Sequence, residues 1–234
     1  MTLKRPPSAK GGSALGSELV RNIIKDMRVE FRSRSALGVA LVFAAVTTLA
    51  VSMVSGGVPF EPKIQAILLW LIMYFSAMNG LAHGFTREAD QGTELFLRIH
   101  SDPDAVYLSK LIFNICLFML VQCVVTPVFA VLMQVEVKNL MYFVLTVAAG
   151  GLATASAVTL LAAMVAKAGG RGPLFTVISL PLVLPVLWVS ITATGRAISG
   201  TAAQGSRDLL FLLAFSGMVI AISFILFRFV WLDE

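Results

Sequence analysis

Charged residues are scarce in this sequence: they make up 13% of its 234 residues, whereas apolar residues make up 58%. The mean hydropathy is +0.88, so a soluble domain of this size would have more apolar surface than one core can bury. Charge is absent from six long stretches, each close to or above the roughly 20 residues with which a helix crosses a bilayer. Lipid offers no partner to an unpaired backbone amide, so each stretch must be helical. The sequence predicts an all-α polytopic membrane protein with six transmembrane helices, at about 36–55, 64–83, 108–133, 140–166, 173–194 and 209–230.

Histidine and cysteine are also rare, with two of each. His83 and His100 cannot build a local metal site, and no G-x-x-x-x-G-K-[ST] loop is present to hold a nucleotide. Cys116 and Cys123 lie about 10 Å apart along one predicted helix, too far for a disulfide, so we expect them to be small packing residues. No ionisable residue lies near the middle of a span, which argues against an ion pump. We therefore predict a non-catalytic chain that binds no metal and no cofactor directly.

Lysine and arginine are distributed unevenly between the two sides of the predicted spans. Fourteen of the eighteen lie in the N-terminal segment, in the second and fourth connections or at the C-terminal end; the others are Lys63, Lys138, Arg196 and Arg207. Short segments rich in Lys and Arg stay in the cytoplasm. We therefore predict that both termini are cytoplasmic, and that the net charge of +5 reflects this topology and anionic lipid, not nucleic-acid binding.

The N-terminal residues divide into two parts. Residues 1–17 contain two prolines in a row and few apolar residues, so we expect a flexible tail. In residues 18–34, apolar side chains recur at helical spacing among five cations, which predicts an amphipathic helix in the membrane interface. The alternative is a cytoplasmic extension of the first span. Residues 18–234 then form one membrane domain.

The connection between the second and third spans carries charges of both signs. Within residues 86–100, one face of a helix can hold the apolar side chains of Ala89, Leu95, Phe96 and Ile99, with charged side chains elsewhere around it. Asp102-Pro103 then supplies an N-cap and a first helical residue, so a new helix begins there and continues into the third span. A short cytoplasmic helix at 86–100 suits docking to a partner. The alternative is an ordinary solvated connector.

Small residues and prolines mark the fourth and fifth spans. Gly150, Gly151 and Thr154 belong to a run of small residues that allows close helix packing, and contact with a second copy or another subunit is the expectation. Pro181 and Pro185 each remove a backbone hydrogen bond, which predicts a kink that either moves or only accommodates packing. The Gly- and Ala-containing segment between residues 194 and 207 predicts a short helical dip before the last span.

Two groups of residues resemble a known family. One is the run Arg87, Glu88, Ala89, Asp90, Gln91, Gly92, Thr93 and Glu94, followed by Leu108-Ser109-Lys110. The other joins Lys167 and Gly169-Gly170 to Leu180-Pro181-Leu182 and Leu184-Pro185-Val186-Leu187. With six spans and a charged helix between the second and third, the chain resembles the permeases of the ABC-2 exporter class. More narrowly, it is similar to haem exporter protein B of the cytochrome c maturation system, the CcmB family, from about residue 18 to residue 228.

This resemblance implies an ABC-2 type permease fold in a transporter complex of the bacterial inner membrane. The helix at 86–100 would be the coupling helix that seats in a separate ABC ATPase subunit, and Pro181 and Pro185 would form a conformational hinge. ATP would bind to that ATPase, while haem would be handled by the complex, which adds a haem-handling membrane subunit and a periplasmic haem chaperone. Two copies of the chain per complex are expected. The residues that would transmit ATPase closure are Arg87, Glu88, Asp90, Gln91, Gly92, Thr93 and Glu94.

The leading hypothesis is a permease subunit for cytochrome c maturation, which couples ATP hydrolysis to haem export or to release of the haem-loaded chaperone. The first alternative is a general ABC-2 permease that exports a drug, a lipid or a polysaccharide. The second is a membrane scaffold that never couples to ATP. The scaffold hypothesis predicts that replacing Glu88 and Glu94 with Lys leaves function intact.

Overall fold

The computed structural model describes residues 20, 23–24, 27–28, 35–81, 103–167, 172–201 and 205–232. These ranges contain no β-strand, and the predicted all-α fold is confirmed. Their six long helices are α2 (Ser35–Ser55), α3 (Pro62–Leu81), α6 (Pro103–Leu132), α7 (Leu140–Lys167), α8 (Gly172–Ser199) and α9 (Gly205–Leu232).

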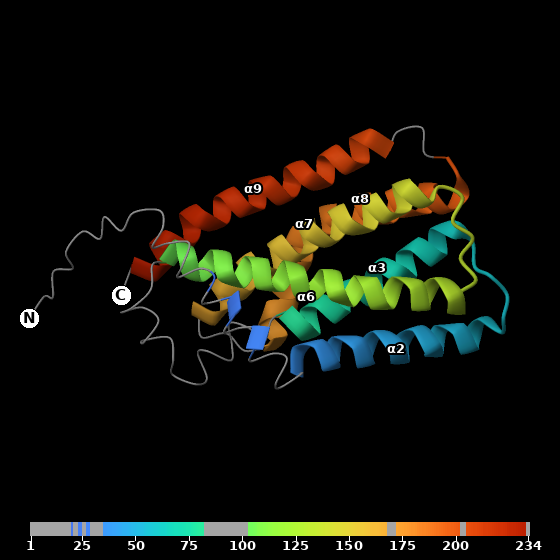
Figure 1. The fold of residues 1–234 in the computed structure, drawn as a ribbon, viewed down its shortest axis with the longest axis horizontal. Coiled ribbons are helices and arrows are strands. Elements are labelled where there is room, and N and C mark those ends of the chain that lie inside the picture. Colours follow the sequence, from blue (N-terminus) through green and yellow to red (C-terminus); the bar gives the residue numbers. More distant parts are fainter. Residues whose placement is uncertain are drawn as a thin grey trace, which may run out of the picture.

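The helices lie along the long axis of the molecule, and consecutive helices run in opposite directions (Figure 1). The connections at 56–61 and 133–139, together with the C-terminal end of α8 and the N-terminal end of α9, lie at one end of the bundle, which we call the short-loop end. The first helix of the bundle, α2, begins at the opposite end. In the α2–α3 connection, Gly56 and Gly57 have φ angles of 60° and 80°, a conformation that glycine adopts without strain.

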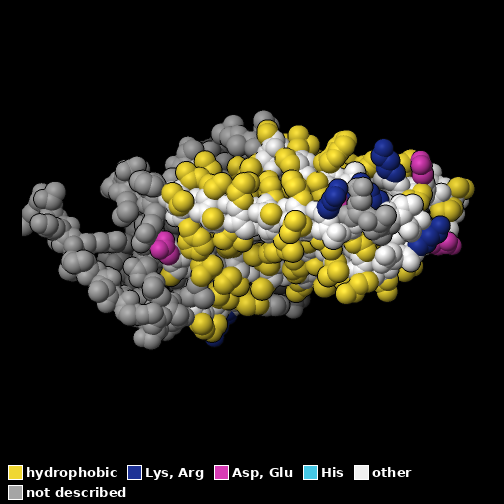
Figure 2. Space-filling view, turned by 90° about the horizontal axis from the view of Figure 1, so that it is seen from above, with side chains coloured by type: hydrophobic (Ala, Val, Ile, Leu, Met, Phe, Trp, Pro, Cys, Tyr) yellow, Lys and Arg dark blue, Asp and Glu magenta, His cyan; other side chains and the backbone are white. Residues whose placement is uncertain are grey.

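Most helices of the bundle are long and apolar enough to lie in a lipid bilayer. By length and apolar composition, α2, α6, α7, α8 and α9 can each cross a membrane, and α3 contributes a shorter apolar stretch, Pro62–Ser76. Hydrophobic side chains cover most of the length of one face, and most of the charged side chains in this view gather near the short-loop end (Figure 2). The protein is therefore a multi-pass membrane protein.

α7 is the central helix of the bundle. In its most apolar stretch 78% of the residues are buried, compared with 17% in α2 and 22% in α9. It contacts α3, α6, α8 and α9. Small buried residues of α7, such as Ala155 and Ala157, pack in one core with large side chains such as Trp70 and Phe118.

Two predicted helix boundaries can be compared with the structure. α6 begins at Pro103, where Asp102-Pro103 predicts a start, and continues without a break into the third span. The predicted helical dip between residues 194 and 207 is wrong for the described part of this segment, because α8 itself continues to Ser199. The helix stops before Gly200, whose φ of 82° favours glycine. The amides of Gly200 and Thr201 both donate to the Arg196 carbonyl oxygen, at 2.9 and 3.1 Å.

Candidate functional site

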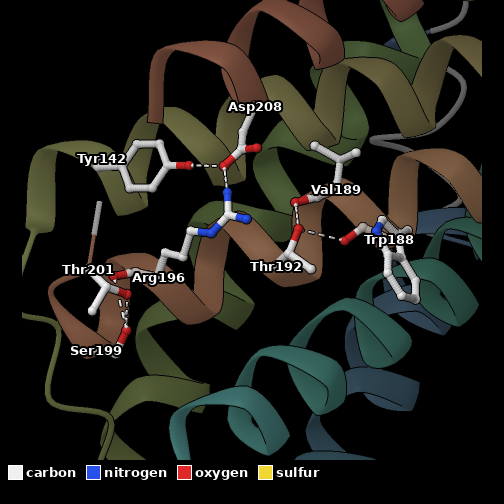
Figure 3. Close-up of polar contacts among 8 residues, drawn as sticks. All are labelled: Tyr142, Trp188, Val189, Thr192, Arg196, Ser199, Thr201 and Asp208. Atoms are coloured by element: carbon white, nitrogen blue, oxygen red, sulfur yellow. Dashed lines mark hydrogen bonds and ion pairs between the residues drawn. The ribbon is translucent and has the colours of Figure 1, made fainter. Parts of the chain in front are cut away.

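The ends of three helices meet at one carboxylate at the short-loop end (Figure 3). Oδ2 of Asp208, in the first turn of α9, accepts hydrogen bonds from Nη1 of Arg196 at 2.5 Å and from the Tyr142 hydroxyl at 2.7 Å. Arg196 lies in the last turn of α8 and Tyr142 in the first turn of α7. The side chains of Arg196 and Asp208 are 36% and 16% exposed, so the ion pair is partly shielded from solvent. We call these three residues the Asp208 cluster.

Local sequence features bring the cluster together. Asn139 caps α7, because its Oδ1 accepts the Tyr142 amide at 3.1 Å. The Asn139 amide in turn donates to the Ala197 carbonyl oxygen of α8 at 3.0 Å. At Gly205 an added Cβ would lie 2.7 Å from the Tyr142 ring, so α9 can begin this close to α7 only with glycine. Arg196 near a helix C-terminus and Asp208 near a helix N-terminus also match the helix dipoles.

In the middle of the bundle, Gly150 provides space for a tryptophan. A Cβ at Gly150 would lie 2.3 Å from Cη2 of Trp70 and 2.6 Å from Oγ of Ser190. Trp70 is 1% exposed, and its Nε1 donates to Oγ1 of Thr194 at 2.9 Å. This contact joins α3, α7 and α8 at one point.

The next residue of α7, Gly151, receives a polar side chain from α6. A Cβ at Gly151 would lie 2.3 Å from Oε1 of Gln122. Nε2 of Gln122 donates to the Val147 carbonyl oxygen at 3.1 Å, while Oε1 has no partner among the described residues. Two adjacent glycines therefore place bulky side chains from α3 and α6 directly against the α7 backbone.

The third small residue predicted for packing, Thr154, is also inside the bundle. It is 1% exposed, and its hydroxyl donates to the carbonyl oxygen of Gly150 in the same helix at 2.8 Å. Gly150, Gly151 and Thr154 thus face other helices of their own chain. The close packing predicted for these three residues therefore occurs within one chain, and contact of this stretch with a second copy or another subunit stays a prediction.

The two prolines of the predicted hinge lie on the exposed side of α8. The helix remains α-helical through Pro181 and Pro185. Both prolines are exposed, together with Leu184 and Trp188, and Trp188 is 73% exposed. The two backbone positions that lack an N–H group because they are prolines therefore lie on the outer side of the bundle. The hinge itself stays a prediction.

Cys116 and Cys123 are not the packing residues expected from the sequence. Both are free thiols and both are exposed on α6, so they do not pack within this chain. Lys110 also belongs to the bundle and not to the connection before it, since it is on α6 and only 4% exposed. At the same end, Nδ2 of Asn114 donates to Oγ1 of Thr159 at 2.9 Å and ties α6 to α7.

Several predicted residues lie outside the described residues. These include His83 and His100, and the residues of the predicted coupling helix: Arg87, Glu88, Asp90, Gln91, Gly92, Thr93 and Glu94. In the predicted interfacial helix at 18–34, only Val20, Ile23, Ile24, Met27 and Arg28 are described, all in helical conformation. Val20 and Ile24 are about half exposed, at 53% and 50%. Both helices therefore remain predictions.

The Asp208 cluster is the polar site that sequence reasoning missed. Arg196 and Asp208 are 12 residues apart on either side of the last connection, and Tyr142 lies 66 residues before Asp208. Opposite charges on either side of one short connection could have indicated the Arg196–Asp208 pair from the sequence. No sequence feature indicates that Tyr142 joins this pair. Chemically, the cluster can hold helix ends together. No group of three His, Cys, Asp or Glu side chains suited to a metal occurs in the described part of the chain.

Comparisons with known proteins agree with the geometry of a membrane bundle. The family described as CcmB protein matches residues 17–227, nearly the whole chain and all but the last residues of α9. A search among curated proteins found no match. The protein therefore belongs to the CcmB family, whose members are non-catalytic membrane subunits of ABC transporters for haem export and cytochrome c biogenesis.

Proposed function

We propose that this chain is the permease subunit that couples ATP hydrolysis by a separate ATPase subunit to haem export or to release of a haem-loaded periplasmic chaperone. The observation that carries the proposal is the family match over residues 17–227, which spans the whole helical bundle up to the last turns of α9. A compact core around α7 supports it, since a permease must transmit motion between its two ends. The chain itself would bind neither ATP nor haem directly.

Coupling to the ATPase is assigned to the connection between α3 and α6. Its residues Arg87, Glu88, Asp90, Gln91, Gly92, Thr93 and Glu94 carry both signs of charge, which suits docking to a polar partner surface. The connection leads directly into α6 at Pro103. A displacement of this segment would therefore act on α6, and through Asn114 and Gln122 on α7.

The orientation follows from the distribution of cations. The short-loop end, which holds Lys63, Lys138, Arg196 and Arg207, would face the periplasm of a bacterial inner membrane. The α3–α6 connection and both termini would face the cytoplasm, where an ATPase can reach them. Two copies of the chain, the ATPase, a haem-handling membrane subunit and the periplasmic haem chaperone would complete the complex.

The role in cytochrome c maturation can be tested in a deletion strain. Covalently bound haem survives denaturation, so haem staining of a denaturing gel detects c-type cytochromes directly. We expect all c-type bands to disappear on deletion and to return when the gene is restored. Normal bands in the deletion strain would contradict the maturation role and favour a general ABC-2 exporter of a drug, lipid or polysaccharide.

The coupling segment needs a separate measurement. Replacing Glu88 and Glu94 together with Lys reverses the local charge and leaves the amino-acid sequence of the described helices unchanged. We expect normal membrane insertion, but loss of ATPase co-purification from detergent-solubilised membranes. A Glu61→Lys variant at the other end of the bundle is the matched control, since Glu61 is exposed just before α3. Retention of the ATPase by the double variant would support a scaffold or an uncoupled permease.

A further inference from the structure

We propose that the Asp208 carboxylate is a clamp that fixes the short-loop end of α9 to α7 and α8, and that α9 is the helix whose position the clamp controls. A single oxygen, Oδ2, is the acceptor for both Arg196 and Tyr142. Polar contacts from both neighbouring helices thus converge on one atom of α9. Loss of that atom removes both contacts in one step.

α9 is suited to be the controlled element because it has the smallest buried share of the three helices that meet at the cluster. Only 22% of its most apolar stretch is buried, compared with 44% in α8 and 78% in α7. Its buried residues Leu212, Ser216, Val219 and Ser223 form one narrow stripe at helical spacing. The hydroxyls of Ser216 and Ser223 donate to carbonyl oxygens of α9 itself. Apolar contacts of Leu212 and Val219 therefore contribute to the attachment along this stripe.

The other end of α9 has a different kind of contact. The ring of Phe224 packs edge-on against Tyr107 of α6, with centroids 5.6 Å apart. Tyr107 is fully buried, so this contact belongs to the core of the bundle. If the hydrogen bonds to Asp208 are lost, α9 stays attached near Phe224 while its short-loop end moves outward. The direction of the movement follows from which end loses its contact.

The location of the cluster strengthens the clamp. Charge-assisted hydrogen bonds are about twice as strong as neutral ones, and partial burial reduces their screening by solvent. The side chain of Asp208 is 16% exposed. Removing the carboxylate also leaves the Arg196 guanidinium and the Tyr142 hydroxyl without this acceptor. The hydrogen bonds to Asp208 thus stabilise the position in which the short-loop end of α9 lies against α7 and α8, and one substitution removes this stabilisation.

Leu212 is the reporter for this movement. It lies one turn beyond Asp208 on α9, is fully buried and packs with Ala149, Ala153 and Val186. When the short-loop end of α9 moves outward, Leu212 must become accessible. Val158 in the centre of α7 is equally buried, but it has no contact with the cluster and serves as the reference position.

The experiment measures thiol labelling of the full chain in native membranes. Cys116→Ser and Cys123→Ser remove the exposed native thiols, and Leu212→Cys or Val158→Cys introduces one reporter. The probe is a small water-soluble maleimide, and the labelling rate is read by mass spectrometry. Each reporter is combined with Asp208→Ala, with Tyr142→Phe, or with Arg207→Ala. Arg207 is the exposed neighbouring charge that takes no part in the cluster.

We expect Asp208→Ala to raise the labelling rate at position 212 about tenfold or more, as loss of hydrogen bonds to a charged group implies. Tyr142→Phe should give a smaller rise, because it removes one of two donors and keeps the ring. Arg207→Ala should change nothing, and position 158 should stay protected throughout. An unchanged rate at 212 in both cluster variants would overturn the clamp. So would an equal rise with Arg207→Ala, or a parallel rise at position 158 in Tyr142→Phe.

Discussion

Replacing Gly150 with alanine tests the contact between α3, α7 and α8. The new Cβ would lie 2.3 Å from Cη2 of Trp70, while ordinary contact begins near 3.4 Å, so the ring must retreat by about 1 Å. Trp70 has no room to do so, because it is 1% exposed and bound to Thr194. Overpacking costs about 1–3 kcal/mol and the strained hydrogen bond about 1 kcal/mol. The higher helix propensity of Ala offsets at most about 1 kcal/mol of this destabilisation. The expected net loss is about 2 kcal/mol.

Thermal unfolding of the purified protein in detergent gives the measurement. A loss of this size lowers the midpoint by about 4–8 °C in a chain of this length. Gly217→Ala is the matched control, because an added Cβ there meets nothing within 4 Å, and it should be neutral or stabilising. Trp70→Leu combined with Gly150→Ala should cost less than the two single changes added together. A Gly150→Ala variant as stable as Gly217→Ala would refute the reasoning.

Three further changes have distinct expected outcomes. Gly151→Ala should destabilise by about 1–3 kcal/mol, because its Cβ would meet the Gln122 amide at 2.3 Å; a Gln122→Ala partner change should recover part of the loss in the same melting assay. Gln134→Gly should raise the melting temperature slightly, because Gln134, in the turn that follows α6, has a φ of 50°, which costs a non-glycine residue about 1 kcal/mol; an unchanged or lower midpoint would argue against strain there. Pro181→Ala with Pro185→Ala should leave the protein at least as stable but reduce haem-stained c-type bands if the prolines form a hinge; normal bands would assign them to packing alone.

The sequence predicted the helices well because a bilayer imposes a simple rule on it. Long uncharged stretches must be helical in lipid, and α2, α7 and α9 are recognisable from that rule alone. Pro103 marked the start of α6, since proline is favoured at the first helical position. The family could be inferred because the acidic run and the double proline are local motifs.

Contacts between helices were harder to predict. The Gly150-Gly151 pair indicates close approach, but nothing local says whether the approaching side chain comes from the same chain, as Trp70 and Gln122 do here. The exposure of Cys116 and Cys123 depends on how α6 is rotated in the bundle. In lipid a buried face and an exposed face of a helix are equally apolar, so the spacing of apolar residues does not show which face is buried. The Asp208 cluster brings together residues that only the folded chain makes neighbours.

The most direct test of the central claim compares haem-stained membranes from three strains: the deletion strain, the strain restored with this chain, and the strain restored with the variant that carries Lys at Glu88 and Glu94. Membrane levels of the chain must be matched by immunoblot. Our account predicts full c-type cytochrome bands only with the unaltered chain, and none with the variant despite normal insertion. Full bands in the deletion strain would contradict the maturation role, and full bands with the variant would contradict coupling through the α3–α6 connection.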